Sequence, residues 1–420
     1  MRGNIRPLRT AVNPDLPPLT RDPATFRTEA RAFLEANAKP RDDAGPWVLH
    51  HHTDVEEARA HFESGRAWQR TLYEAGFAGL TYPAEYGGRG GDAWHDRVFA
   101  EEAARFALPA AYVSSTIAML APALLAHGTG DQRRRLLPRL LGATDAWCQL
   151  FSEPGAGSDL ASLGCRAVRD GDELVVNGQK VWSSSAQFCE RGMLLVRTDP
   201  NAPKHRGISF LLADMAAPGV DVRPLVQPTG AAHFNEVFLH DVRIPLTEVL
   251  GEIDEGWAPA RTVMANEAAF IGGGGHGAHH QLVLLAQEHD LIGQPAIRQE
   301  LARNYTRERL LELMGRRIVA ALREGATPPI DPSILKLYVA QNRVESGNLA
   351  FAIAGPAALA AAAGDEQARW AQAELLNRFA VSIGGGTDEV QRNNLAERAL
   401  SLPREPRPDR DTPWRDLLRS

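Results

Sequence analysis

Apolar residues recur every three to four positions through the first third of the chain, as they do on one face of a helix. The stretch PATFRTEARAFLEANA begins directly after Asp22, and an Asp-Pro pair at that place is typical of a helix start. Three further stretches keep this spacing, while the glycine-rich TYPAEYGGRGGD interrupts them as a loop. The pattern predicts an N-terminal helical domain over residues 21–146, preceded by an extended, Pro-rich arm over residues 1–20.

The period of the pattern becomes shorter near Trp147. Short runs rich in apolar and β-branched residues then follow at regular spacing, and such runs are typical of antiparallel strands. They include RGMLLVRTD, RGISFLLADM, GVDVRPLVQ and NEVFLHDVRIP. The dipeptide Asn177-Gly178 predicts a two-residue hairpin turn between two of the strands. We therefore expect a middle antiparallel β domain over residues 147–253.

Helical spacing returns after Glu255. The segments GWAPARTVMANEAAFIGG and AIRQELARNYTRERLLELMGRRIVAALREG are the first of several, and their lengths suit antiparallel packing in a bundle. The sequence thus predicts a C-terminal helical bundle over residues 254–405 and a tail over residues 406–420. The expected fold class is α+β, in the order helical, β, helical.

Two apolar stretches, Ala110–Gly128 and Leu349–Gly364, are candidates for membrane helices. Both are rich in Ala rather than in the larger aliphatic residues of a spanning segment, and Pro122 lies inside the first. We expect both to be buried helices of a water-soluble core, with no membrane span.

Composition narrows the function classes. The chain has 420 residues, a formal net charge of −6 and no long basic run, so nucleic acid is not expected as its main partner. Cys148, Cys165 and Cys189 form no CxxC pair, which indicates reduced thiols. The N-terminus lacks the apolar core of a signal peptide, and we therefore expect a cytoplasmic protein.

Two stretches of the predicted β domain could contact a ligand. In WCQLFSEPGAGSDLASL, glycines let the backbone come close to a bound group, and Ser152 and Ser158 add hydroxyls. In NGQKVWSSSAQF, Trp182 precedes three serines, which gives a flat apolar face with hydroxyls at its edge. Such a face suits a planar heteroaromatic ring, although taken alone the first stretch is an ordinary turn and the second a core Trp.

A third stretch, SIGGGTDEVQRNN, combines three glycines with two carboxylates. Glycines of this kind are typical of a backbone that holds a phosphate at the start of a helix, whereas paired carboxylates are typical of acid/base chemistry. The phosphate alternative is the one that agrees with the family resemblance described below. Asp388 and Glu389 then fall in the first helical turn, where negative side chains are favoured, so we expect them to be structural.

Taken together, these stretches resemble the acyl-CoA dehydrogenase family over nearly the whole chain. The motifs occur in the family's order, and so does the helical, β and helical layout. The stretches that carry the resemblance are TYPAEYGG, FSEPGAGSD, NGQKVWSSS, HRGISFLLADM, FNEVFLHDVRIP, GEIDEGW, SIGGGTDEVQRN and ERALSLPREPR.

The resemblance implies FAD between the β domain and the C-terminal helices. Gln149, Phe151 and Ser152 would line the flavin ring, with Ser152 in place of a frequent Thr. Trp182 and Ser184 would take flavin-contacting positions, and Ser158 would lie near the thioester side of the acyl-CoA. The expected contacts to the FAD pyrophosphate or ribose are Gly384, Gly385, Gly386, Thr387 and Gln391. In the family part of this contact crosses a subunit boundary, which implies a homodimer or homotetramer.

Dehydrogenation of a thioester needs a base for the α proton and an acceptor for the β hydride, and the flavin is the acceptor. The resemblance implies that electrons leave to an electron-transferring flavoprotein. Many family members carry the base two residues before the loop Thr, but that position here is Gly385. A second family position, on the helix after GW, corresponds to Glu267 in RTVMANEAAF. We expect Glu267 to be the base and to be semi-buried, whereas the plain alternative is a solvated helix Glu.

The sequence departs from the family at two places. Ala268 replaces the usual Arg after the base, and the Arg-x-x-Phe-Gly motif is absent, with HDLIGQPAIRQELA in its place. Ala268, Ala269 and the four glycines from Gly272 predict a wide acyl pocket that admits a bulky or branched group. His276, His279 and His280 have no carboxylate partner at convincing spacing, so no metal is expected.

Two other functions stay open at this point. The chain could have this fold and still act as a flavin oxidase or monooxygenase on a substrate without CoA, as some relatives do. The replacement of the usual Arg by Ala268 makes this alternative worth testing. The chain could also be a non-catalytic subunit of a hetero-oligomer, an alternative supported by the altered Arg-x-x-Phe-Gly region.

Overall fold

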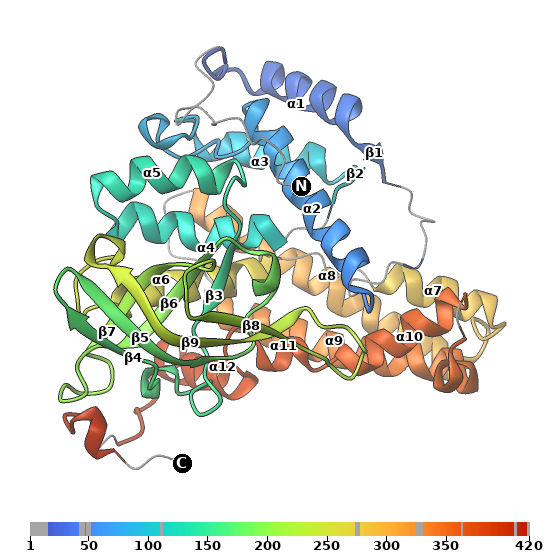
Figure 1. Cartoon of the computed structure of the whole chain (residues 1–420). Coiled ribbons are helices and arrows are strands. Elements are labelled where there is room, and N and C mark those ends of the chain that lie inside the picture. Colours follow the sequence, from blue (N-terminus) through green and yellow to red (C-terminus); the bar gives the residue numbers. More distant parts are fainter. Residues whose placement is uncertain are drawn as a thin grey trace.

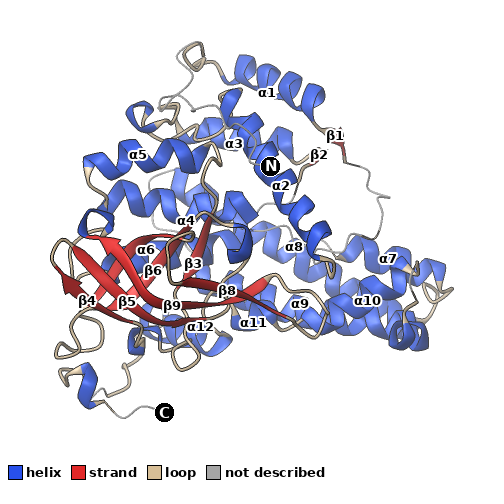
Figure 2. Cartoon of the chain, in the orientation of Figure 1, coloured by secondary structure: helices blue, strands red, loops and turns tan. Residues whose placement is uncertain are grey.

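The computed structural model describes residues 16–41, 47, 52–109, 112–273, 278–323, 331–362, 364–406 and 410–417. Figure 1 shows N-terminal helices, a sheet and C-terminal helices, in that order along the chain. Figure 2 shows the strands of the larger sheet gathered at one end of the molecule, with helices above and beside them, and the short strands β1 and β2 apart from them. The predicted order of helical, β and helical parts is confirmed.

The N-terminal part consists of helices joined by loops and one small sheet. The helices are α1 (Pro23–Asn37), α2 (Val55–Glu74), α3 (Ala93–Ala103), α4 (Tyr112–His127) and α5 (Gly130–Leu141), and β1 (Lys39–Pro40) pairs with β2 (Phe106–Ala107). At the start of α1 the Asp22 carboxylate accepts a hydrogen bond from the Thr25 backbone N–H at 3.0 Å. This cap and Pro23 in the first turn explain why the helix begins where the sequence predicts it.

Helix α4 contains the first apolar stretch and is largely buried, as expected. Pro122 lies inside the helix without ending it. Within the described part of the chain, no helix combines the length and the hydropathy needed to cross a bilayer.

The middle part is a seven-stranded sheet. Its strands are β3 (Trp147–Leu150), β4 (Arg166–Asp170), β5 (Glu173–Lys180), β6 (Arg191–Arg197), β7 (Ile208–Asp214), β8 (Val220–Leu225) and β9 (Phe234–Pro245). They are ordered β3-β6-β4-β5-β9-β8, and β7 pairs with β6. Most pairs are antiparallel, as predicted, but β6 pairs in parallel with both β3 and β4.

The predicted hairpin turn at Asn177-Gly178 is wrong. Both residues lie inside β5, where the register with β9 shifts between Val176 and Gly178, and the hairpin turn falls between Asp170 and Glu173 instead. A Cβ on Gly178 would lie 2.7 Å from the Cys165 sulfur, so the glycine is needed for a close approach between strands and not for a turn.

The C-terminal part is helical. It comprises α6 (Trp257–Gly273), α7 (His279–Glu288), α8 (Pro295–Arg323), α9 (Pro332–Ala354), α10 (Glu366–Asn377), α11 (Ala380–Ile383) and α12 (Asp388–Asn394). The second apolar stretch is not one buried helix, because α9 ends at Ala354 and a 3-10 segment, Gly355–Ala360, follows. Pro356 supplies no N–H to continue the helix, and Leu359 is exposed.

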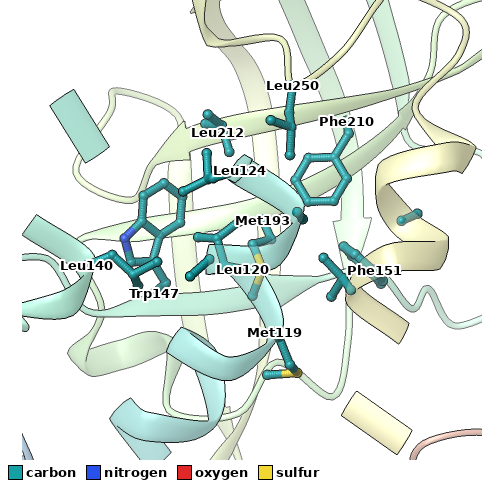
Figure 3. Close-up of a cluster of buried hydrophobic side chains, with 14 of the residues drawn as sticks. Met119, Leu120, Leu124, Leu140, Trp147, Phe151, Met193, Phe210, Leu212 and Leu250 are labelled. Atoms are coloured by element: carbon teal, nitrogen blue, oxygen red, sulfur yellow. The ribbon is translucent and has the colours of Figure 1, made fainter. Parts of the chain in front are cut away.

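One apolar cluster joins the N-terminal helices to the sheet. Figure 3 shows side chains of α4 and α5 packed with side chains of β3, β6 and β7. Its labelled members are Met119, Leu120, Leu124, Leu140, Trp147, Phe151, Met193, Phe210, Leu212 and Leu250. Because α6 adds Ala260 and Val263 to the same cluster, α4, β3 and α6 are held in fixed positions relative to one another.

Candidate active site

Glu267 lies near the C-terminal end of α6, beside strand β3. Its Oε2 accepts a hydrogen bond from Gln149 Nε2 at 3.4 Å, which links the predicted base to a predicted flavin-contacting residue. Burial raises the pKa of the Glu267 carboxyl, while the hydrogen bond from Gln149 opposes that rise. A carboxylate with a raised proton affinity suits the removal of a weakly acidic C–H proton.

Tyr112, the first described residue of α4, joins strand β3 to the second predicted stretch. Its hydroxyl donates to the Ser184 carbonyl oxygen at 2.5 Å and lies 3.5 Å from the Trp147 carbonyl oxygen. Burial raises the pKa of Tyr112, and the nearby Cys189, Cys148 and Glu267 groups add to that rise, so the hydroxyl stays protonated. The cluster around Tyr112 therefore joins Ser184 to β3, the strand that carries Gln149, and Glu267 is near enough to affect the pKa of the Tyr112 hydroxyl.

Sequence reasoning missed Tyr112. It stands in an Ala- and Ser-rich apolar run that predicts only a buried helix. The sequence feature that could have indicated it is a Tyr within an apolar run. A buried Tyr hydroxyl usually has a specific hydrogen-bond partner.

The two predicted ligand-contacting stretches are joined by their backbones and by a buried ion pair. Val181 N–H donates to the Ser152 carbonyl at 2.9 Å. Next to it, Lys180, whose side chain is fully buried, donates to the Phe151 carbonyl at 3.1 Å and to Glu153 Oε1 at 2.7 Å. The ends of β3 and β5 are thus fixed side by side.

Trp182 presents a flat aromatic surface directly after this junction. Its side chain is 58% exposed, its backbone has a φ of 63°, and its ring meets Phe234 edge-on at 5.6 Å. Ser183 Oγ beside it is buried and has no hydrogen-bond partner among the described residues. An exposed indole next to an unused hydroxyl fits the planar, polar-edged ring system of a flavin.

The glycine turn after β3 is open on its outer side. Glu153 and Ala156 exchange backbone hydrogen bonds of 3.1 and 3.0 Å across it. A Cβ on Gly155 or Gly157 would meet no atom within 4 Å, and Ser158 is exposed. The turn can therefore approach a ligand closely with its backbone and with the Ser158 hydroxyl.

The GGGT segment lies in a different part of the molecule. Gly385 and Gly386 have φ values of 65° and 81°, and Thr387 caps α12 by accepting from Val390 N–H at 3.3 Å. Gln391 is buried and donates to the Gly385 carbonyl at 2.9 Å. No hydrogen bond between described residues joins this segment to the cluster around Tyr112.

The two carboxylates of this segment lie in the first turn of α12, as predicted, and each forms an ion pair. Asp388 pairs with the buried Lys336 of α9 at 3.2 Å, and Glu389 pairs with Arg392 at 3.0 Å. Helix α12 packs on α9, which also packs on α6, so α9 lies against both parts of the predicted site.

Part of the predicted acyl pocket lies outside the described residues. Residues 274–277, which include His276, and the side chains of Ala268 and Ala269 belong to this part. His279 is described, and its Nδ1 lies 3.1 Å from Asn304 Oδ1. The prediction of a wide pocket stays a prediction.

Comparisons with known proteins identify the family of the chain. Three family models match the chain: the N-terminal domain of acyl-CoA dehydrogenases over residues 20–144, the middle domain over 148–242 and the C-terminal domain over 254–400. Acyl-CoA dehydrogenase IpdE1 of Mycobacterium tuberculosis is 38% identical, over 91% of this chain and 99% of its own length.

Two solved structures resemble the chain over its whole fold. The steroid acyl-CoA dehydrogenase Tcur3481-Tcur3483 superposes with a TM-score of 0.73 at 30% identity, covering 92% of this chain and 99% of the other. The ChsE4-ChsE5 complex of Mycobacterium tuberculosis gives a TM-score of 0.69 at 29% identity, covering 92% and 99% of the two chains.

Proposed function

The chain belongs to the acyl-CoA dehydrogenase family, and we propose that it oxidises the Cα–Cβ bond of an acyl-CoA with Glu267 as the base. The observation that carries the proposal is the hydrogen bond between Glu267 and Gln149 in a setting that raises the pKa of the carboxyl. Gly385, at the family's other base position, has no side chain that could take a proton.

The cofactor of the proposed reaction is FAD. Gln149, Phe151, Ser152, Trp182 and Ser184 would hold its flavin ring, and the GGGT segment with Gln391 would face its phosphates or ribose. When bound, FAD would supply the acceptor for the β hydride. The exposed Trp182 and the unused Ser183 hydroxyl support this fit.

In the proposed reaction the protein performs the proton transfer and the positioning. Glu267 removes the α proton, and its raised pKa brings its proton affinity closer to that of the carbon acid. The Tyr112 hydroxyl holds the Ser184 carbonyl and stays neutral, so it adds no charge beside the carboxylate. Ser158 would contact the thioester side of the substrate.

We propose a bulky or ring-bearing acyl group. The small residues after Glu267 support this choice of substrate. One of the similar structures is named a steroid acyl-CoA dehydrogenase, which also supports it. Anaerobic loss of flavin absorbance across a panel of straight-chain, branched and ring-bearing acyl-CoAs tests the choice. Fast reduction by the ring-bearing members supports it, whereas a clear preference for short straight chains contradicts it.

Electrons are proposed to pass to an electron-transferring flavoprotein. The competing function is an oxidase or monooxygenase of the same fold, which the loss of the usual Arg at Ala268 keeps in view. Oxygen uptake during turnover without any other acceptor separates the two: a dehydrogenase shows little, and an oxidase shows one O2 per substrate consumed.

The protein is proposed to work as an oligomer that involves its C-terminal helices. Ile383 and Leu400 are each 67% exposed, which is unusual for large apolar side chains. A groove of about 520 Å³ between α9, α11 and α12 lies nearby, lined among others by Ile334, Tyr338 and Leu395.

The second copy could be this chain or a related one. The two similar structures are named after pairs of proteins, which supports a mixed assembly, whereas the family resemblance implies a homodimer or homotetramer. Light scattering of the chain expressed alone gives the oligomer. Protein that is yellow and reduced by acyl-CoA when purified alone contradicts the idea of a non-catalytic subunit.

A further inference from the structure

The C-terminal tail leaves the helical bundle and binds to the sheet domain. It lies beyond residue 400, where the match to the family's C-terminal domain ends. Figure 1 shows the tail, in red, below β4 and away from the helices that precede it in the sequence. The contacts of the tail with the sheet domain show whether it has a structural role.

Three backbone contacts attach the tail to the loop between β6 and β7. Pro413 forms a bridge with Pro203, Trp414 N–H donates to the Ala202 carbonyl at 2.9 Å, and Arg415 N–H donates to the Pro200 carbonyl at 3.0 Å. The tail thus adds a short strand-like edge to residues 199–206.

The Trp414 side chain attaches the tail to a second loop. It is only 9% exposed, and its indole Nε1–H donates to the Ser162 carbonyl at 3.1 Å. A Cβ on Gly164 would lie 3.4 Å from the indole ring, so the glycine leaves room for it. The indole therefore occupies a slot between residues 160–164 and residues 199–206.

Arg197 connects the same two loops beneath the indole. Its buried guanidinium donates to the carbonyls of Ala161 at 2.6 Å and of Arg206 at 2.7 Å, and it lies 4.9 Å from the centre of the Trp414 ring. Burial lowers the pKa of Arg197 to about 10, so the group stays charged at neutral pH and favours the face of the aromatic ring.

Asp159 links the two loops that Trp414 contacts to the glycine turn after β3. The Asp159 carboxylate accepts from Ser162 Oγ at 2.5 Å and pairs with Lys204 at 2.8 Å, and it directly follows Ser158. The loop that Trp414 holds is therefore continuous with the residue expected to face the thioester side of the substrate.

We infer that the tail is a latch, and that Trp414 is a positioning residue that holds the turn at Ser158 in the geometry that acyl-CoA binds. The inference rests on the proposed function for the substrate and on the contacts alone for the latch. A latch of this kind affects substrate binding more than the chemical step, because Trp414 holds the loop that follows Ser158, whereas the proposed base Glu267 belongs to α6.

The test combines three variants with hydrogen exchange and steady-state kinetics on the FAD-loaded full chain. In Trp414→Ala we expect amide exchange to become about tenfold faster in residues 158–164 and 199–206. We also expect KM for the acyl-CoA to rise about tenfold with kcat within about twofold, as for the loss of one hydrogen bond and its packing.

Two further variants serve as rescue and control. Trp414→Phe keeps a ring over Arg197 and loses only the bond to Ser162, so most of the change should be reversed. Asp411→Ala alters an exposed residue of the same tail and should behave as wild type.

The outcomes separate the two proposals. Unchanged exchange in Trp414→Ala overturns the latch, whatever the activity. Faster exchange with an unchanged KM overturns the role in substrate binding. Faster exchange in a chain whose wild type dehydrogenates no acyl-CoA supports the latch and overturns the proposed function.

Discussion

The surroundings of Glu267 and those of Gly385 differ in the groups that they present to a substrate or a cofactor. Glu267 of α6 accepts a hydrogen bond from Gln149 of β3, and Tyr112 of α4 links the same strand to Ser184, after β5. Gly385 lies in a loop with left-handed backbone, supported by Gln391 and by α9. The first region offers a side chain with a shifted pKa, and the second offers backbone N–H groups. The resemblance implies that the family can place its base at either position, and in this chain only the first position has a side chain that can accept a proton.

The largest expected effect is on turnover. Glu267→Gln keeps the shape and the contact with Gln149 but removes the proton acceptor, so kcat should fall by about 10³-fold, or ~4 kcal/mol. Steady-state assays with an artificial electron acceptor measure it, and Glu288→Gln, at an exposed position on α7, is the control. Turnover near the wild-type rate in Glu267→Gln would show that Glu267 is not the base.

The next largest effect is on stability at the end of the sheet. Lys180→Met removes the buried cation beside Glu153, which keeps only its hydrogen bonds from the Gly164 and Cys165 backbone N–H groups, and should lower the free energy of unfolding by about 3 kcal/mol. The double variant Lys180→Met/Glu153→Gln has no uncompensated charge and should recover most of the loss. Chemical denaturation of all three proteins checks this, and an unaltered midpoint in Lys180→Met would show that the pair does not support the site.

Gly385→Ala tests the loop with a smaller effect. A Cβ at a φ of 65° should cost about 1–2 kcal/mol of stability. If the loop serves phosphate binding and not proton transfer, FAD retention should fall while kcat of the FAD-loaded fraction stays within about twofold. A large fall in kcat of the FAD-loaded fraction would indicate that the loop takes part in the chemical step.

The smallest effect concerns pH. Burial raises the pKa of Glu267, and the base must be ionised, so kcat/KM should fall on the acidic side as pH drops through that raised pKa. Gln149→Leu removes the hydrogen bond that opposes the rise, and the acidic limb should move to higher pH. A limb that stays in place, measured with FAD content matched, would mean that another group controls it.

The sequence was sufficient for features that depend on local pattern. The start of α1 at Asp22-Pro23, the order of the three parts and the position of Glu267 on an apolar helix all follow from neighbouring residues. The prediction at Asn177-Gly178 was wrong, because the glycine allows the close approach of Cys165, the residue before β4, and does not form a turn.

The sequence was insufficient where a residue's role depends on distant partners. Lys is rarely buried, and nothing local predicts that Lys180 pairs with Glu153 across 27 positions. Tyr112 and Trp414 likewise gain their roles from Ser184 and Ser162, which lie 72 and 252 positions away. Such contacts form only when the sheet and the helices come together.

Proton removal by Glu267 can be measured apart from hydride transfer. An acyl-CoA whose Cβ carries no hydrogen, such as 3,3-dimethylbutanoyl-CoA, can lose its α proton but cannot be oxidised. In D2O the FAD-loaded wild type should incorporate deuterium at Cα, detected by mass spectrometry, and Glu267→Gln with equal FAD content should not. Incorporation by Glu267→Gln at the wild-type rate would contradict the assignment of Glu267 as the base.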